Sequence, residues 1–225
     1  MDITSIIDFK VVINNRNRLS TTKKLVEDLL ERNTKQIWIL DNGSTYEPLL
    51  DWYQTLPKEV EVKRYDNEGY LAIFSTGLIN EIEEEWCFYT DSDIELNPKM
   101  TKDYQEAMLY YAHALDSKKI SLALDITDLP DHYWFKEQVK RNEGRWWLDE
   151  VEPNVFRADT DTTFSLIQKC DQFSSFRLGG DFTSKHIPWY IDLDNLTEEE
   201  TYYIDNCADN KLTQYTKQHK LRQEL

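Results

Sequence analysis

Two acidic side chains stand one residue apart directly after an apolar and aromatic stretch of the chain. The stretch runs from Trp86 to Thr90, and the two acids are Asp91 and Asp93. A short apolar run of this kind is typical of a buried strand, which would present both carboxylates at its carboxyl end. Carboxylate oxygens in this setting can hold a divalent cation, and such a cation can bind a diphosphate. The pattern therefore favours chemistry on a nucleotide-activated substrate.

The acid pair also has a plain structural interpretation, as a solvated turn or as a cap for a helix after Pro98. We favour the metal site, because a hydrophobic strand that leads straight into two acids is the setting expected of a hard cation. Two other devices that bind phosphate are missing. No GxGxxG follows the first expected strand, no GxxxxGK[ST] occurs anywhere, and the chain has only 6 glycines. A metal ion bound by the acid pair is then the best candidate for neutralising the charge of a bound phosphate group.

The elements that would position these acids alternate along the first hundred residues. Strands are expected over residues 9–13, 36–40, 60–64 and 86–90, and helices from Ser20 as a cap, over 47–54 and over 71–80. Continuous apolar strands separated by helices predict a parallel sheet that is covered on both faces. Ligands of such sheets bind at the carboxyl ends of the strands. The polar segments 14–18, 41–44 and 91–93 should therefore meet at one edge.

The second half of the chain is less regular. A helix is expected over 100–115 and strands over 120–124, 145–148 and 162–168, while 128–141 is ambiguous. The polar segment from Thr197 should be helical, because Thr197 and Glu200 have the spacing of a capping box. No internal repeat or linker is seen, so a single domain over 1–225 is expected. The fold class is α/β, a Rossmann-like sheet with helices on both faces and a mixed or antiparallel C-terminal part.

Composition excludes several classes of protein. The 26 basic residues face 42 acidic ones, and the resulting net charge of −16 disfavours binding to nucleic acid or to an anionic membrane surface. The 3 cysteines form neither a CxxC pair nor a zinc pattern, and so sparse a set favours a reducing compartment. No signal peptide and no apolar run of membrane-spanning length is found. We expect a cytoplasmic protein, or a soluble domain of a larger one.

Four segments together resemble the nucleotide-sugar glycosyltransferases of the GT-A fold, close to family two. They are Val11–Arg18, similar to the opening strand and its arginine-bearing loop; Ile37–Ser44, similar to the hhhDNgS turn; Asn67–Gly69 with Ala72 and Gly77; and Asp91–Asp93, similar to the DxD motif. Each segment is weak alone, but their order and spacing over about residues 9–100 are fairly specific. The later segments 158–164 and 186–190 are similar to a DTTF segment and to one that supplies a metal-ligating His.

The resemblance implies a GT-A fold in which residues 1–100 bind the nucleotide sugar and 101–225 bind the acceptor and end in a helix. It implies transfer of a hexosyl or deoxyhexosyl group from a UDP-, GDP- or dTDP-sugar to a hydroxyl of a glycan, polysaccharide or glycoprotein. The cofactor would be Mn²⁺ or Mg²⁺. The implied metal ligands are Asp91, Asp93 and His186. The candidate substrate-binding residues are Asn14, Arg16, Arg18, Asp41, Asn67, Asp91 and Trp147.

Several of these residues have a second interpretation from sequence. His186 can be a satisfied imidazole, and Arg16 and Arg18 can form surface salt bridges instead of meeting phosphate or base. Asp41 can contact the base or ribose, form an Asx turn with Gly43, or do both. Trp147 can stack on a sugar ring or pack in the core. These alternatives stay open at this point.

Sugar transfer to a hydroxyl also needs a base, and a carboxylate that is ionised at neutral pH can serve. Asp161 is the first candidate and Asp159 the second, although either can cap the segment that follows. A single base implies single displacement with inversion at the anomeric carbon. The Glu-Asp pair that family two usually places before an acceptor-side helix is missing here.

Three other classes of protein share part of this sequence pattern. A nucleotidyltransferase acting on sugar phosphates also uses acids at strand ends and a divalent ion, but it usually has a glycine-rich and basic loop after the first strand, and residues 14–18 contain no glycine. A DxDxT phosphatase would need Thr where Glu95 stands. A catalytically inactive carbohydrate-binding module would not require both Asp91 and Asp93.

Overall fold

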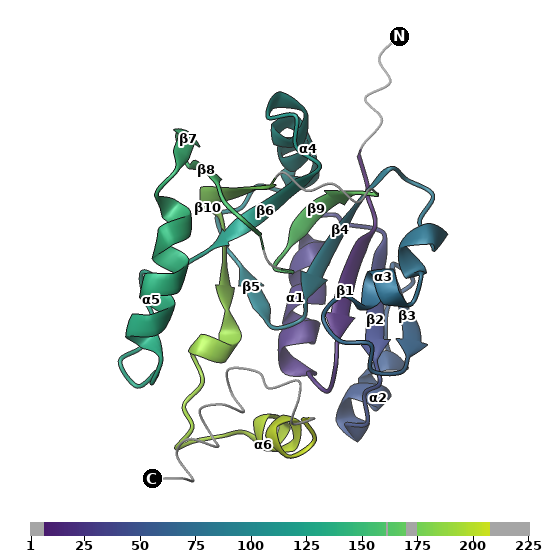
Figure 1. Ribbon diagram of the computed structural model, residues 1–225. Coiled ribbons are helices and arrows are strands. Elements are labelled where there is room, and N and C mark those ends of the chain that lie inside the picture. The colour runs from purple at the N-terminus through teal and green to yellow at the C-terminus, as the bar shows by residue number, and fades with distance from the viewer. Residues whose placement is uncertain (1–6, 161, 170–174, 208–225) are drawn as a thin grey trace.

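The computed structural model describes residues 7–160, 162–169 and 175–207. One mixed sheet forms the centre of this part of the chain, with strand order β3-β2-β1-β4-β9-β6-β10-β8-β7 and β5 paired with β10 (Figure 1). The strands are β1 (Val11–Asn15), β2 (Ile37–Asn42), β3 (Val60–Tyr65), β4 (Trp86–Asp91), β5 (Ile94–Leu96), β6 (Lys119–Leu124), β7 (Glu150–Glu152), β8 (Val155–Arg157), β9 (Ser165–Gln168) and β10 (Ser175–His186). The helices are α1 (Ser20–Glu31), α2 (Glu47–Tyr53), α3 (Ala72–Ser75), α4 (Tyr104–Ala114), α5 (Lys136–Gly144) and α6 (Glu198–Asp205).

The first four strands of the order are parallel, and the sheet becomes mixed beyond them. β1 pairs in parallel with β2 and β4, and β2 pairs in parallel with β3. β9 is antiparallel to both of its neighbours, β4 and β6, while β10 runs parallel to β6 and antiparallel to β5 and β8. The expected α/β sheet with a parallel N-terminal part and a mixed C-terminal part is therefore confirmed.

Both faces of the sheet are buried, as continuous apolar strands require. Val11 and Ile13 of β1 belong to a core cluster that includes the apolar side of α1 and α4, whereas Val12 points into a second cluster with Ala72 and Ile73 of α3. Successive side chains of a strand point to opposite faces, so one five-residue strand serves both clusters. Figure 1 shows the helices on either side of the sheet.

Two expected elements are wrong in detail. The helix expected over 71–80 breaks at Gly77, whose φ of +77° is left-handed, and the chain continues as a 3₁₀ turn over Leu78–Glu81. The strand expected over 145–148 is a 3₁₀ turn over Arg145–Trp147 that continues directly from α5. A third 3₁₀ turn covers Ile187–Trp189. None of the described helices is long and apolar enough to cross a membrane.

The C-terminal helix α6 forms where the sequence predicts it. Thr197 and Glu200 make the expected capping box, in which the Thr197 hydroxyl accepts from the Glu200 amide and the Glu200 carboxylate accepts from the Thr197 amide. Helix α6 lies beyond the carboxyl ends of β1 and β2 (Figure 1). The expected cap by Ser20 is wrong, because Ser20 is the first helical residue of α1 and its side chain accepts no capping bond.

Helix α1 is instead capped from α6. The Glu199 carboxylate accepts hydrogen bonds from the amides of Leu19 and Ser20 at 2.9 Å each and from the Ser20 hydroxyl at 3.0 Å. The first amides of a helix lack partners within the helix and carry partial positive charge, so a carboxylate there is stabilising. The start of α1 and the first turn of α6 are thus tied together.

Burial in this fold predicts unequal reactivity of two thiols. Cys87 on β4 is 0% exposed, and burial raises its pKa to about 12, whereas Cys207 is partly exposed. Because the thiolate is the reactive form, we expect iodoacetamide at pH 8 to label Cys207 and to leave Cys87 unmodified until the protein is unfolded. Peptide mass mapping of native and unfolded samples measures this. Equal labelling of both thiols in the native protein would contradict the buried position of β4.

Candidate active site

Strand register brings the predicted polar segments to one edge. Asn14 lies opposite Asp91 across β1 and β4, and Asn15 lies opposite Asp41 across β1 and β2. Parallel strands end together, so the residues that follow them share this carboxyl edge. The expected meeting of segments 14–18, 41–44 and 91–93 is confirmed by this register.

Asp93 lies between two cationic or potentially cationic side chains. Its Oδ2 is 3.2 Å from Arg18 Nη2, and its Oδ1 is 3.8 Å from His186 Nε2. A backbone hydrogen bond also joins the two segments: the Ile187 amide donates to the Asp93 carbonyl at 2.8 Å. The three side chains come from the loop after β1, the turn after β4 and the end of β10. The structure thus brings together three residues that the sequence singled out at distant positions.

Solvent has limited access to this cluster, which we call the Asp93 cluster (Arg18, Asp93 and His186). The side chains are 8%, 14% and 20% exposed, respectively. The imidazole also packs edge-on against Trp189, with 4.8 Å between the ring centres. Partial burial strengthens charge–charge interactions relative to those on an open surface. A charged ligand at this cluster would therefore interact more strongly with its side chains than it would on an open surface.

Asp91 is engaged by the segment that precedes β9. Its Oδ2 accepts a hydrogen bond of 2.5 Å from the Thr162 hydroxyl, and its amide donates to the Thr162 carbonyl at 3.1 Å. Thr162 of the DTTF-like segment therefore contacts Asp91 directly. Asp161, the first candidate for the base, lies outside the described residues.

The donor set fits a divalent ion that also takes ligands from a substrate. The Asp93 carboxylate and the His186 imidazole lie 3.8 Å apart after β4, while the Asp91 carboxylate binds the Thr162 hydroxyl, and Mg²⁺ sites can use one or two carboxylates plus phosphate oxygens and water. Among the described residues, no three His, Cys, Asp or Glu side chains form a complete metal cluster. Asp93 and His186 could therefore hold an ion only with further ligands from a diphosphate and water, and the three-residue set Asp91, Asp93 and His186 stays a prediction.

Asp41 forms the turn that was one of its two predicted roles. Its side chain is 0% exposed and its Oδ1 accepts from the Ser44 amide at 2.8 Å, while Gly43 adopts a φ of +77°. Burial, together with the nearby Asp41 carboxylate, raises the pKa of the Tyr53 hydroxyl, which accepts a hydrogen bond from Asn15. The Asx turn is confirmed, and the contact of Asp41 with a base stays a prediction.

Two asparagines fix the segment that contains Asn67. The side-chain amides of Asn14 and Asn42 both donate to the Gly69 carbonyl, at 3.2 and 2.8 Å, and the Asn67 side chain accepts from the Gly69 amide. Asn14 Oδ1 is buried and has no hydrogen-bond partner among the described residues. A buried acceptor without a partner is costly, so Asn14 is ready for a ligand donor.

Three further candidates make described contacts with residues outside the Asp93 cluster. Asp159 is exposed, and its carbonyl accepts from Arg177 Nε at 2.8 Å. Trp147 packs on Phe156, with 5.1 Å between ring centres, which matches the core-packing alternative. Arg16 donates to the Asn206 carbonyl at 3.4 Å and so contacts the end of α6.

Sequence reasoning assigned no chemistry to α6, yet α6 contacts the site. The Tyr203 ring lies 3.9 Å from the Arg18 guanidinium carbon, and the Tyr202 hydroxyl donates to the Thr45 carbonyl at 3.0 Å. The Tyr202 ring also lies 4.9 Å from that of Tyr46. No local pattern could have shown these contacts, because they join residues more than 150 positions apart.

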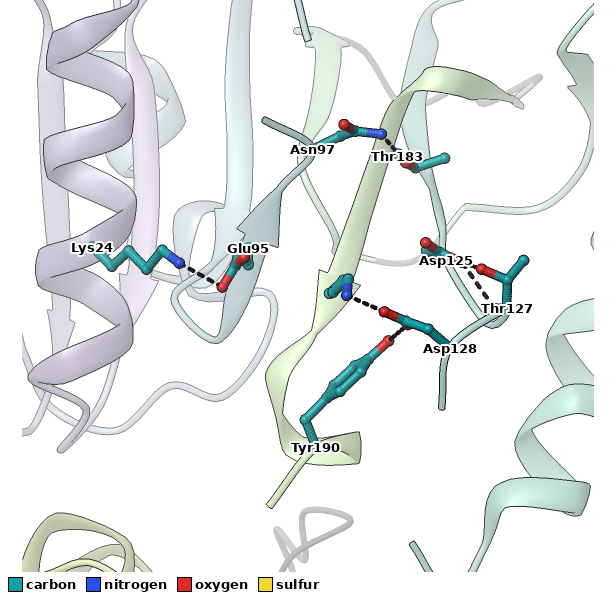
Figure 2. Close-up of polar contacts among 9 residues, drawn as sticks. Lys24, Glu95, Asn97, Asp125, Thr127, Asp128, Thr183 and Tyr190 are labelled. Carbon is teal, nitrogen blue, oxygen red and sulfur yellow. Dashed lines mark hydrogen bonds and ion pairs between the residues drawn. The ribbon is translucent and has the colours of Figure 1, made fainter. Parts of the chain in front are cut away.

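A cavity of about 120 Å³ lies beside β5, between the ends of β6 and β10, and is lined by Glu95, Leu96, Asn97, Pro98, Asp125, Thr183, Ser184 and Lys185. Figure 2 shows how its polar residues pair with one another or with neighbours, as in Lys24–Glu95 and Asn97–Thr183. Lys185 lies opposite Glu95 on β5, and strand alternation turns both away from His186. The cavity is therefore separate from the Asp93 cluster.

Comparison with known protein families identifies the part of the chain that forms the parallel strands. The sequence model of the family described as Glycosyl transferase family 2 matches residues 10–117. Residues 10–117 form a glycosyl transferase family 2 domain. All four segments that carry the resemblance lie essentially within this range, so that prediction is confirmed for this part of the chain. The segments 158–164 and 186–190 lie outside it.

The chain is similar in structure to a solved mannosyltransferase. Mannosyltransferase PcManGT from Pyrobaculum calidifontis, determined in complex with GDP-Man and Mn²⁺, shares 15% sequence identity at a TM-score of 0.48. The similarity covers 74% of this chain and 46% of that protein, so the present chain spans about half the length of the mannosyltransferase. No curated protein matches the chain.

Proposed function

We propose that the protein transfers a sugar from a nucleoside-diphosphate sugar to a hydroxyl group of a glycan acceptor. One observation carries the proposal: Arg18, Asp93 and His186 meet at the carboxyl edge of a sheet whose parallel part is a family 2 domain. Ligands of such sheets bind at this edge. The family 2 domain also favours sugar transfer over the nucleotidyltransferase and phosphatase alternatives. The donor would be a UDP-, GDP- or dTDP-sugar carrying a hexosyl or deoxyhexosyl group.

The site residues suit departure of a nucleoside diphosphate. Asp93, with Asp91 and His186, would hold Mn²⁺ or Mg²⁺, and this ion would offset the negative charge that builds on the leaving phosphate. The Arg18 guanidinium can donate to phosphate oxygens in paired hydrogen bonds. Asn14 Oδ1, buried at the same edge, can accept from a hydroxyl of the donor. Each residue thereby has a role in binding or in charge stabilisation.

The acceptor hydroxyl must lose a proton as the new bond forms. We assign this task to Asp161, with Asp159 as the second candidate, because a carboxylate that is ionised at neutral pH can accept the proton. The neighbouring Thr162 binds Asp91, which supports a role for this part of the chain. Attack by one hydroxyl on the face opposite the diphosphate gives single displacement and inverts the anomeric carbon. NMR of the product anomer tests this stereochemistry, and a retained configuration would contradict it.

Donor binding can be tested without knowing the acceptor. A thermal-shift panel of UDP, GDP and dTDP, each with and without Mn²⁺, should give a rise in Tm with at least one nucleotide that depends on the metal. A ligand that binds only the native state stabilises it by mass action, and the stabilisation reaches about 2.7 kcal/mol at a ligand concentration a hundred times Kd. The absence of a shift with every nucleotide would contradict donor binding at this edge.

A further inference from the structure

Arg18 is enclosed between the acid of the sheet edge and an aromatic ring of α6. Its Nη2 lies 3.2 Å from Asp93 Oδ2, and its guanidinium carbon lies 3.9 Å from the centre of the Tyr203 ring. The Arg18 side chain is only 8% exposed. A guanidinium that contacts both a carboxylate and an aromatic face is held more firmly than one on an open surface.

Helix α6 is itself anchored on the loops that follow β1 and β2. Glu199 binds the amides of Leu19 and Ser20 at the start of α1, and the Tyr202 hydroxyl binds the Thr45 carbonyl. These contacts, made by residues that precede Tyr203 in the same helix, help to fix where its ring lies. The position of the Arg18 guanidinium is therefore set jointly by the sheet edge and by α6.

This arrangement conflicts with a divalent ion on Asp93. A dication bound by that carboxylate would lie next to the guanidinium, and the two positive charges would repel strongly at a partly buried site. Arg18 cannot relieve the conflict by losing its proton, because the guanidinium stays charged throughout the accessible pH range. Either the metal binds weakly or Arg18 moves.

We propose that Arg18 is an exchangeable counter-ion of Asp93, which the metal ion and the donor diphosphate displace together. The inference rests on the proposed function and deepens it. Metal alone must replace the Arg18–Asp93 ion pair at a partly buried site, so metal alone binds weakly. A diphosphate supplies that partner, because its oxygens accept from the guanidinium in paired hydrogen bonds. Metal and nucleotide therefore bind cooperatively, and Tyr203 sets how firmly Arg18 resists displacement.

The test measures Mn²⁺ affinity alone and in the presence of UDP, GDP or dTDP, by calorimetry and by the EPR signal of free Mn²⁺. Arg18→Gln removes the charge and keeps a hydrogen-bonding side chain. We expect it to bind Mn²⁺ alone about tenfold more tightly than the wild type, and to lose most of the gain that the nucleotide produces. Tyr203→Leu should tighten binding of Mn²⁺ alone by about threefold, because it removes only the aromatic contact.

Lys24→Gln is the matched control. It removes one positive charge from α1, where Lys24 pairs with Glu95 two residues beyond Asp93 (Figure 2). Its Mn²⁺ affinity should equal that of the wild type, which separates a specific effect of Arg18 from a change in net charge.

The outcomes separate the inference from the proposed function. Wild-type Mn²⁺ affinity and an unchanged nucleotide effect in Arg18→Gln would overturn the inference alone. Should Arg18→Gln fail to fold, as judged by circular dichroism, unchanged affinity in Tyr203→Leu would overturn it in the same way. If the wild-type protein bound no Mn²⁺ with any of the three nucleotides, both the inference and the metal-dependent function would fall.

Discussion

Replacing Asp93 by Asn is expected to reduce sugar transfer by about a thousandfold and to remove the metal-dependent thermal shift with the donor nucleotide. Asn keeps the shape of the side chain but cannot offer a charged oxygen to a cation. It also leaves Arg18 and His186, at 3.2 and 3.8 Å, without the carboxylate that balances them. Initial rates of sugar transfer with Mn²⁺, together with the thermal shift, measure both effects.

Asp51→Asn is the control for this change, because Asp51 is an exposed acid on α2. Its activity and thermal shift should match those of the wild type. Circular dichroism of Asp93→Asn should show native secondary structure, since the substitution preserves volume. Retention of a tenth or more of the wild-type rate in Asp93→Asn would contradict a metal site at this acid.

Replacing Phe164 by Ala is expected to lower the free energy of unfolding by about 3–5 kcal/mol. Phe164 is 0% exposed, and its ring centre lies 5.3 Å from that of Phe88 and 5.7 Å from that of Tyr104. Truncation would remove buried apolar area and leave a cavity where β4, β9 and α4 meet. Urea denaturation followed by circular dichroism gives the change in unfolding free energy.

Phe74→Ala is the matched control for that loss of stability. Phe74 on α3 is 40% exposed, so the same chemical truncation should cost no more than about 1 kcal/mol. Equal losses in the two variants would mean that the Phe164 ring is not part of the packed core. Because Phe164 stands two residues after Thr162, its loss should also loosen the contact of Thr162 with Asp91.

The parallel half of the fold could be predicted because its signals are local. Continuous apolar runs such as 36–40 are long enough to mark buried strands, and helices separate them. β10 was missed because its twelve residues include Gly179 and Gly180 and alternate irregularly, with a register shift between Leu178 and Thr183. Only pairing with β5, β6 and β8 makes this segment a strand, and no local pattern contains that information.

The candidate site likewise has residues that could be predicted from local sequence and contacts that could not. Asp91 and Asp93 follow a strand whose apolar pattern is unmistakable, so their place at the edge could be predicted. The partnership of Arg18 with Asp93 and Tyr203 depends on how distant segments pack, and the sequence indicated only that Arg18 follows the first strand. For Trp147 the sequence left sugar stacking and core packing open; the structure shows packing against Phe156, and a sugar contact stays a prediction.

The cap that Glu199 places on α1 joins residues 180 positions apart. Closing so large a loop is slow and entropically costly, so this contact must form late in folding. While the chain is still being synthesised, the first helix has no carboxylate at its beginning until residue 199 has left the ribosome. Competence to bind a ligand at the loop before α1 is therefore acquired only once nearly the whole described chain is available, and a nascent chain stalled before that point would carry an unfinished site.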